Sequence, residues 1–138
     1  MADVYGIEPN KLISEVAKKL EEREEIKPPK FMAYSKTGPH VEFGPESKRF
    51  WYVRCASILR QAYVNGEVSV GGLRVHYGGR KRHRVASAHH VDAGGSAIRK
   101  AMQQLEAAGL LKKGQKRGRV LTSEGIKLLN SIAKGIKE

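Results

Sequence analysis

The chain has 138 residues, of which 26 are lysine or arginine and 14 are aspartate or glutamate, so its net charge at pH 7 is +12. At 40% hydrophobic residues it can bury a core, which excludes a disordered tail, and its length predicts one domain over residues 1–138. No apolar run is long enough to span a bilayer and the first residues show no signal peptide, so we expect no membrane partner.

The first half of the chain predicts two helices joined by a loop. Apolar residues recur at helical spacing on one face of residues 8–25, and Pro28 and Pro29 stop this helix. The pattern over residues 30–45 is irregular and predicts a loop that lies over the core. Residues 47–65 form the most apolar helix, which we expect to be buried by several neighbours and to end at Gly66.

Two arginines, Arg54 and Arg60, interrupt this apolar helix. Each guanidinium could be held toward a phosphate or stacked on a base, or each aliphatic stem could pack on the surface with its charge in water. Six residues separate them by roughly 240° around a helix, so they cannot share one patch. A structural role therefore stays open for at least one of them.

The second half predicts three further helices, a long loop and a hairpin. Residues 70–77 can form a short helix, whereas residues 78–95 have glycines at both ends and no apolar period, which predicts a long loop suited to ordering against phosphates. Ser96 can cap a helix over residues 96–108. Apolar pairs at 110–111 and 120–121 flank a basic, glycine-rich tip and predict a β-hairpin, after which Thr122 starts the last helix.

Most of the positive charge falls in this second half. Between residues 74 and 119 there are twelve bases and two acids, whereas residues 1–30 contain six bases and seven acids. An excess this large, rich in arginine and interrupted by glycine, favours contact with phosphate over a merely solvated surface. The sequence therefore predicts a nucleic acid as the main partner.

The order of elements is typical of a winged helix-turn-helix over about residues 66–138. The predicted fold class is mainly α, a helical bundle with a winged-helix-like core and one small β-hairpin as the wing. Arg99, Lys100, Gln103 and Gln104 are expected on the outward side of the second helix, where solvent exposure of the glutamines is a simpler interpretation than base contact. The wing would present Lys112, Lys113, Lys116, Arg117 and Arg119.

The same pattern is weak for function, because winged helices serve several classes of partner. One alternative is a DNA-binding transcription regulator that dimerises and reads bases from residues 99–104. Another is a protein-interaction module, which would require an exposed apolar patch and would bind its partner with little dependence on salt.

Four blocks of sequence distinguish between these classes. They are Asp3-Val4 with the first helix and Lys27-Pro28-Pro29; Trp51 through Arg60 with Tyr63; Val70-Gly71 through Arg80; and Ile98 through Glu106 with Gly118-Arg119, Leu121-Thr122 and Gly125. Through these blocks the chain resembles, over nearly its whole length, the S19e family of small-subunit ribosomal proteins of archaea and eukaryotes.

The resemblance implies a structural constituent of the small-subunit head that binds ribosomal RNA, contacts neighbouring small-subunit proteins and supports RNA maturation and assembly. It implies that Arg54 lies at the RNA-facing surface and that Arg60 matches a second basic position. Together with the basic loop and wing, the predicted RNA-binding residues are Arg54, Arg60, Tyr77, Gly78, Gly79, Arg80, Lys81, Arg82, Arg84, Arg99, Lys100, Lys112, Lys113, Lys116, Arg117 and Arg119.

Catalytic or metal chemistry has little support in the sequence. None of the five histidines has zinc-binding spacing, and no carboxylate pair lies near them, with Asp92 as a lone candidate. Cys55, the only cysteine, excludes an internal disulfide and is expected to be a packed thiol in a reducing compartment. We therefore expect no enzyme activity, metal or cofactor, and a protein that is monomeric when free, cytoplasmic and ribosome-associated.

Overall fold

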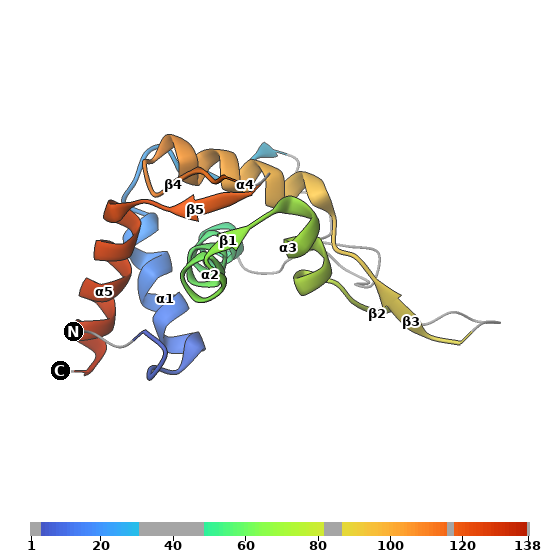
Figure 1. Cartoon of the computed structure of the whole chain (residues 1–138), viewed down its shortest axis with the longest axis horizontal. Coiled ribbons are helices and arrows are strands. Elements are labelled where there is room, and N and C mark those ends of the chain that lie inside the picture. Colours follow the sequence, from blue (N-terminus) through green and yellow to red (C-terminus); the bar gives the residue numbers. More distant parts are fainter. Residues whose placement is uncertain (1–3, 31–48, 82–86, 116–117, 138) are drawn as a thin grey trace.

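The computed structural model describes residues 4–30, 49–81, 87–115 and 118–137. Within them the predicted mainly helical fold with a small hairpin wing is confirmed (Figure 1). The elements in chain order are α1 (Pro9–Leu20), α2 (Phe50–Asn65), β1 (Glu67–Val68), α3 (Val70–Tyr77), β2 (Gly79–Lys81), β3 (His89–Val91), α4 (Gly95–Ala107), β4 (Leu111–Lys113), β5 (Arg119–Leu121) and α5 (Ser123–Lys137). No described helix is long and apolar enough to cross a membrane.

Helix α2 lies at the centre of the fold, as its apolar composition predicts. Helices α1 and α5 pack side by side on one flank, α4 and the sheet lie over α2, and α3 is on the other flank (Figure 1). Trp51, Cys55, Ile58 and Leu59 are at most 2% exposed. Burying several large apolar side chains of one helix stabilises the fold by about 1.5–3 kcal/mol for each of them, which makes α2 the main source of core stability.

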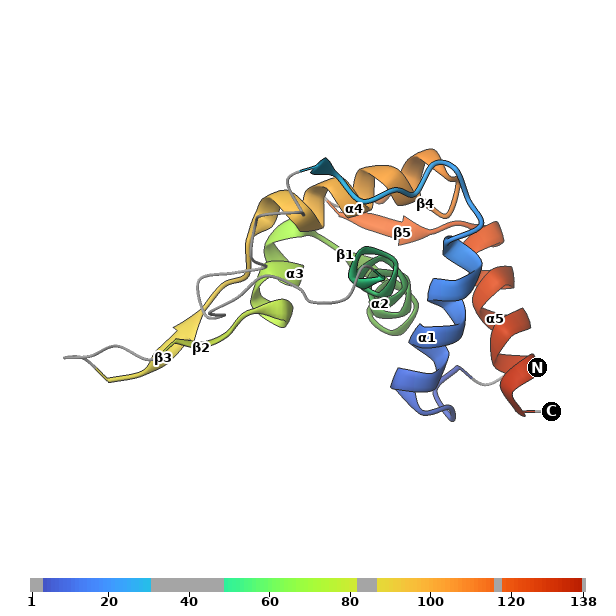
Figure 2. The same cartoon turned by 180° about the vertical axis from the view of Figure 1, so that it is seen from behind.

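Helix α1 ends at Leu20, five residues before its predicted end at Glu25. Glu21, Glu22, Glu24 and Glu25 would place four negative charges at a helix C-terminus, where the helix dipole disfavours them. The chain instead turns after Leu20, buries Ile26 completely and runs across α4 (Figure 2). The predicted loop over residues 30–45 lies, from residue 31 onward, outside the described residues.

The predicted wing is part of a three-stranded antiparallel sheet of order β1-β5-β4. Strands β4 and β5 pair Leu111 with Leu121 and Lys113 with Arg119, which confirms the predicted hairpin. The third strand, β1, pairs Glu67 with Val120 and was not predicted, because two residues are too few for an alternating pattern.

A second hairpin, β2–β3, occupies the region predicted to be a long loop, and that prediction is wrong for the described residues. Gly79 pairs with Val91, Arg80 with His90 and Lys81 with His89. The hairpin projects from the end of the molecule next to α3 (Figure 1). Its strands, Gly-Arg-Lys and His-His-Val, contain no fully buried residue and form no apolar face, so the backbone pairing leaves no hydrophobic signal in the sequence.

The starts of the last two helices differ in how they are capped. Helix α4 begins at Gly95, and its N-cap residue Gly94 makes no side-chain hydrogen bond, so the predicted cap by Ser96 is wrong. The predicted role of Thr122 is confirmed, because its Oγ1 accepts a hydrogen bond from the backbone N–H of Gly125 at 3.2 Å.

Candidate nucleic-acid interface

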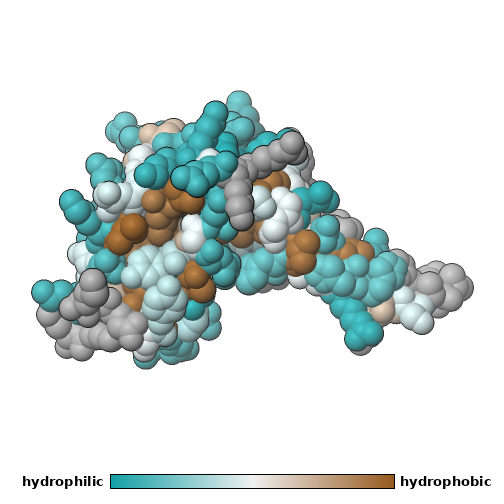
Figure 3. Space-filling view, in the orientation of Figure 1, coloured by the Kyte–Doolittle hydropathy of each residue, from teal (hydrophilic) through white to brown (hydrophobic). Residues whose placement is uncertain are grey.

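Hairpin β2–β3 presents the first group of predicted RNA-binding residues. Arg80 is exposed and its guanidinium donates two long hydrogen bonds to the Ala88 carbonyl, at 3.4 and 3.5 Å, while Lys81 is half-buried. The described surface at this end of the molecule is largely hydrophilic (Figure 3). Arg82 and Arg84 lie outside the described residues. The hairpin thus projects positive charge away from the helical core.

The acids in this half of the chain do not neutralise these cations. Asp92 and Glu106 are the only acids between residues 74 and 119, and each has a nearby partner: His90 at 3.5 Å and Arg119 at 3.0 Å. On the two hairpins and α4, six predicted RNA-binding residues form no ion pair with any described carboxylate: Arg80, Lys81, Arg99, Lys100, Lys112 and Lys113. Uncompensated charge of this kind attracts a polyanion.

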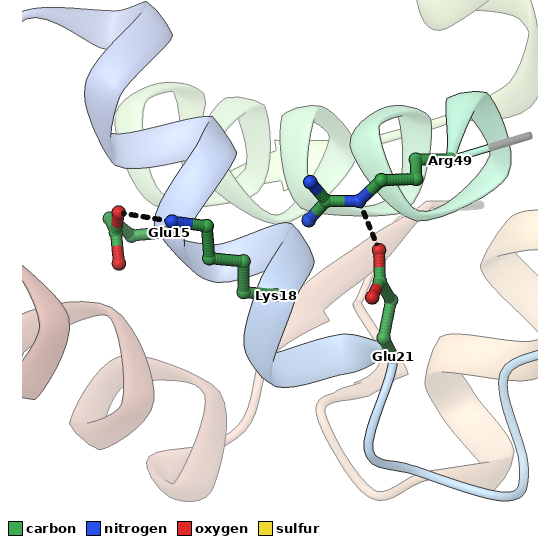
Figure 4. Close-up of polar contacts among 4 residues, drawn as sticks. All are labelled: Glu15, Lys18, Glu21 and Arg49. Carbon is green, nitrogen blue, oxygen red and sulfur yellow. Dashed lines mark hydrogen bonds and ion pairs between the residues drawn. The ribbon is translucent and has the colours of Figure 1, made fainter. Parts of the chain in front are cut away.

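The acids of the first third are arranged differently. Glu15 pairs with Lys18 at 3.1 Å within α1, and Glu21 at the end of α1 pairs with Arg49 before α2 (Figure 4). Part of the charge in this region is therefore compensated locally. The largest share of the positive excess of the described chain lies on the two hairpins and α4.

The wing is shaped by Glu67, a residue that the sequence analysis missed. Its Oε1 accepts a hydrogen bond from the backbone N–H of Gly118 at 3.0 Å, and a Cβ on Gly114 would lie 2.5 Å from the same oxygen. No local pattern could have identified it, because its partner Gly118 is 51 residues away in the sequence. Lys112 and Lys113 are exposed on the wing, while Lys116 and Arg117 lie outside the described residues.

Arg119 is placed differently from the wing lysines. Its Nε donates to Oε2 of Glu106 at 3.0 Å, and the side chains of the two residues are 26% and 34% exposed. This pair links β5 to α4. The positive charge of Arg119 is therefore mainly compensated within the fold, by Glu106.

Two predicted residues from separate segments come together at the base of hairpin β2–β3. The guanidinium carbon of Arg54 lies 3.9 Å from the ring centroid of Tyr77 and 5.0 Å from that of Phe50. The Tyr77 hydroxyl and Ser57 Oγ are 2.6 Å apart. Burial lowers the pKa of Arg54 and raises the pKa of Tyr77, so water is partly excluded from the cluster.

Arg60 does not join this cluster, in agreement with the angular separation expected on one helix. It is half-buried, and its Nε is buried without a hydrogen-bond partner in the described part of the chain. A buried donor without a partner costs free energy. The structure therefore leaves this nitrogen unsatisfied by the described residues.

Gly78, also a predicted site residue, is required by close backbone packing. A Cβ on Gly78 would lie 2.3 Å from the carbonyl oxygen of Val91, which no side chain tolerates. The glycine therefore lets the entrance and the exit of the hairpin approach each other. Gly79 follows as the first residue of β2 and pairs with Val91.

The outward face of α4 carries Arg99, Lys100 and Gln103 as exposed residues, whereas the expectation of an outward Gln104 is wrong. Gln104 Oε1 accepts from Trp51 Nε1 at 2.8 Å and from the Lys27 backbone N–H at 3.1 Å. Its Nε2 donates to the Lys27 carbonyl at 2.8 Å. The connection after α1 thus occupies this side of α4, and Gln104 cannot read bases while these bonds persist.

The described residues contain no group of three or more histidine, cysteine, aspartate or glutamate side chains that could hold a metal ion. Cys55 is a fully buried free thiol, as predicted. Burial raises its pKa to about 12, which keeps the sulfur protonated and unreactive.

Comparison with known proteins identifies the family of the chain. The family model of ribosomal protein S19e matches residues 3–138. Small ribosomal subunit protein eS19 of Aeropyrum pernix is 42% identical over 140 residues, which cover 100% of this chain and 92% of that protein. The proteins of Haloarcula marismortui (eS19, 37%, covering 96% and 90%) and Ascaris suum (eS19G, 38%, covering 98% and 92%) are also similar. The chain therefore belongs to the ribosomal protein S19e family.

Proposed function

We propose that this chain is a structural constituent of the small ribosomal subunit, that it binds ribosomal RNA in the subunit head, and that it supports maturation and assembly of that RNA. The observation that carries the proposal is the set of six uncompensated cations on hairpin β2–β3, α4 and the wing. The names of the relatives, which are small-subunit proteins, support the same assignment.

The binding mechanism follows from the chemistry of these residues. Each lysine or arginine that meets a phosphate releases condensed counterions, so affinity falls as salt concentration rises. Double-stranded RNA exposes phosphates and 2′-hydroxyls more than base edges, so recognition by shape suits two projecting hairpins. Arg54 and Arg60 belong to the proposed site with the residues of the hairpins and α4.

Membership of a ribosomal protein family makes the chain a structural component and not an enzyme. We further propose that it contacts neighbouring small-subunit proteins, that it is monomeric before assembly, and that it resides on cytoplasmic ribosomes. Sedimentation of a cell lysate tests this placement, because the chain should follow the small-subunit peak and should dissociate from it at high salt.

The binding proposal is tested with small-subunit ribosomal RNA transcribed in vitro and with duplex DNA of equal length. We expect tighter binding to the RNA at 0.15 M salt and a steep fall of affinity with salt. Arg80→Glu should weaken binding and incorporation into small subunits while leaving helical content intact. Lys134→Glu, the same charge change on exposed α5, is the matched control. Equal affinity for both nucleic acids, or normal incorporation of Arg80→Glu, would contradict the proposal.

A DNA-binding regulator remains the alternative from the sequence, and no structural observation favours it. Base reading from α4 would need an open outward face, but the bonds from Gln104 to Lys27 and Trp51 close part of it. A regulator would also elute as a dimer and would prefer a specific duplex, and the same binding and size-exclusion measurements detect both properties.

A further inference from the structure

We propose that Arg54 is a positioning residue that sets the direction of hairpin β2–β3 through the ring of Tyr77. The inference rests on the proposed function in one respect, namely that the hairpin is an RNA-binding element. Its structural part concerns the free protein and does not depend on that function.

The first support is the geometry at the hairpin base. Arg54 and Ser57 are three residues apart and therefore lie on the same side of α2. Tyr77 is the last residue of α3, two residues before β2. The guanidinium of Arg54 lies 3.9 Å from the Tyr77 ring centroid, and the Tyr77 hydroxyl lies 2.6 Å from Ser57 Oγ. The central helix thus contacts both the face and the hydroxyl of the tyrosine that leads into the hairpin.

The second support is that the exit of the hairpin is tied to α3. Arg74 Nε donates to the carbonyl of Ala93 at 2.9 Å, and the backbone N–H of Ala93 donates to the carbonyl of Arg74 at 2.9 Å. Gly78 packs on the carbonyl of Val91. Helix α3 and the base of the hairpin therefore form one connected unit, and the contact of Tyr77 with Arg54 joins that unit to α2.

The third support is the weakness of the hairpin itself. Each strand has three residues, and an isolated two-stranded hairpin is at best marginally stable in water. Its direction must therefore be fixed at its base. Arg54 is suited to that task because its guanidinium lies over two aromatic rings. The attraction between a cation and an aromatic ring becomes stronger as water is excluded.

The alternative role of Arg54 is a direct contact with a phosphate, which would need an accessible guanidinium. The face of its guanidinium is taken by the rings of Tyr77 and Phe50 and it is half-buried, whereas Arg80 is exposed at the projecting end. If Arg54 acted only as a phosphate contact, removing the Tyr77 ring would free the guanidinium and leave RNA affinity unchanged. If Arg54 acts through Tyr77, loss of either side chain has the same effect.

Residual dipolar couplings of backbone amides in the free, full-length chain test the structural part. Arg54→Met and Tyr77→Leu should reduce the couplings of residues 79–81 and 89–91, while those of α2 and α5 stay at their original values. Arg54→Lys and Tyr77→Phe, which keep a cation and a ring respectively, should restore most of the loss. Arg99→Met is the matched control, because it removes an equal charge from an exposed position without a ring contact. Unchanged hairpin couplings in both Arg54→Met and Tyr77→Leu would overturn the proposal.

Binding to in vitro transcribed small-subunit RNA tests the consequence. Arg54→Met and Tyr77→Leu should each weaken binding about three- to tenfold, and the double variant should be no weaker than either single variant. Unchanged affinity of Tyr77→Leu beside a weakened Arg54→Met would overturn the positioning role. Failure of the unaltered chain to bind this RNA would instead refute the proposed function, and the couplings would still decide the role of Arg54.

Discussion

The indole N–H of Trp51 donates a hydrogen bond to Oε1 of Gln104 at 2.8 Å, which joins the central helix α2 to α4. The same amide group bonds to both backbone polar atoms of Lys27, so three segments distant in sequence meet at one side chain. Trp51 is only 2% exposed, and water cannot easily replace its partner. Gln104 is therefore a structural residue on a helix whose Arg99, Lys100 and Gln103 are exposed.

Gln104→Leu should lower the free energy of unfolding by about 1–3 kcal/mol, because the buried Trp51 N–H would lose its acceptor. Urea unfolding followed by tryptophan fluorescence measures the change. Gln103→Leu, one residue away and exposed, should stay within about 0.5 kcal/mol of the unaltered chain. Equal effects of the two substitutions would show that the bond to Trp51 contributes nothing.

Two glycines of the same region should respond oppositely to alanine. Gly71→Ala should raise the free energy of unfolding by about 0.5–1 kcal/mol, because Gly71 lies inside α3 and its Cβ would have open space. Gly78→Ala should distort hairpin β2–β3, because its Cβ would lie 2.3 Å from the Val91 carbonyl. Thermal unfolding and amide exchange of residues 79–81 measure both effects. A Gly78→Ala chain with full hairpin protection would refute the close-packing argument.

The basic residues of the wing should separate into two kinds. Lys112→Ala or Lys113→Ala should reduce the slope of log affinity for ribosomal RNA against log salt by about 1 and leave stability unchanged. Arg119→Met should instead lower the free energy of unfolding by about 1 kcal/mol, since it breaks the half-buried pair with Glu106, and should change the slope less. Salt-dependent binding and urea unfolding of the three variants provide the comparison. An Arg119→Met chain that behaves like the lysine variants would contradict this division.

The buried thiol of Cys55 should make stability depend on alkaline pH. Burial raises its pKa from 9.0 to about 12, so between these values the unfolded chain loses the proton and the folded chain keeps it. Stability is unaffected below pH 9 and falls above it, by at most about 1.4 kcal/mol per pH unit. The measurement is the free energy of unfolding at pH 8 and pH 10.5 for the unaltered chain and Cys55→Ala. The variant should lose less between the two pH values; an equal loss would indicate an ionised or accessible thiol.

Sequence periodicity predicted the elements that bury an apolar face. Helices α2, α4 and α5 and the wing β4–β5 follow that rule, because each places apolar residues at the spacing of its structure. The pattern could not show hairpin β2–β3, whose strands bury no face of their own, or the early end of α1 after Leu20. Those features depend on backbone pairing and on contacts with other segments.

The candidate site was predictable in composition but not in arrangement. Charge density pointed to residues 74–119 as the nucleic-acid-binding part, since acids are scarce there. Nothing in the sequence indicated that Arg119 would be occupied by Glu106 or that Arg54 would stack on Tyr77. These partners come from elements that are remote in the sequence. Only the tertiary structure therefore distinguishes exposed cations from those held in an ion pair or a ring contact.

The register of hairpin β2–β3 comes from backbone pairing and from the space left at Gly78. Arg80 and His90 add side-chain contacts to the Ala88 carbonyl and to Asp92, but the strand pairing runs through backbone atoms. A substitution on this hairpin can therefore change its contact with RNA while the helical core stays the same. In this hairpin, the proposed RNA recognition depends on side-chain atoms, whereas the strand pairing depends on backbone atoms.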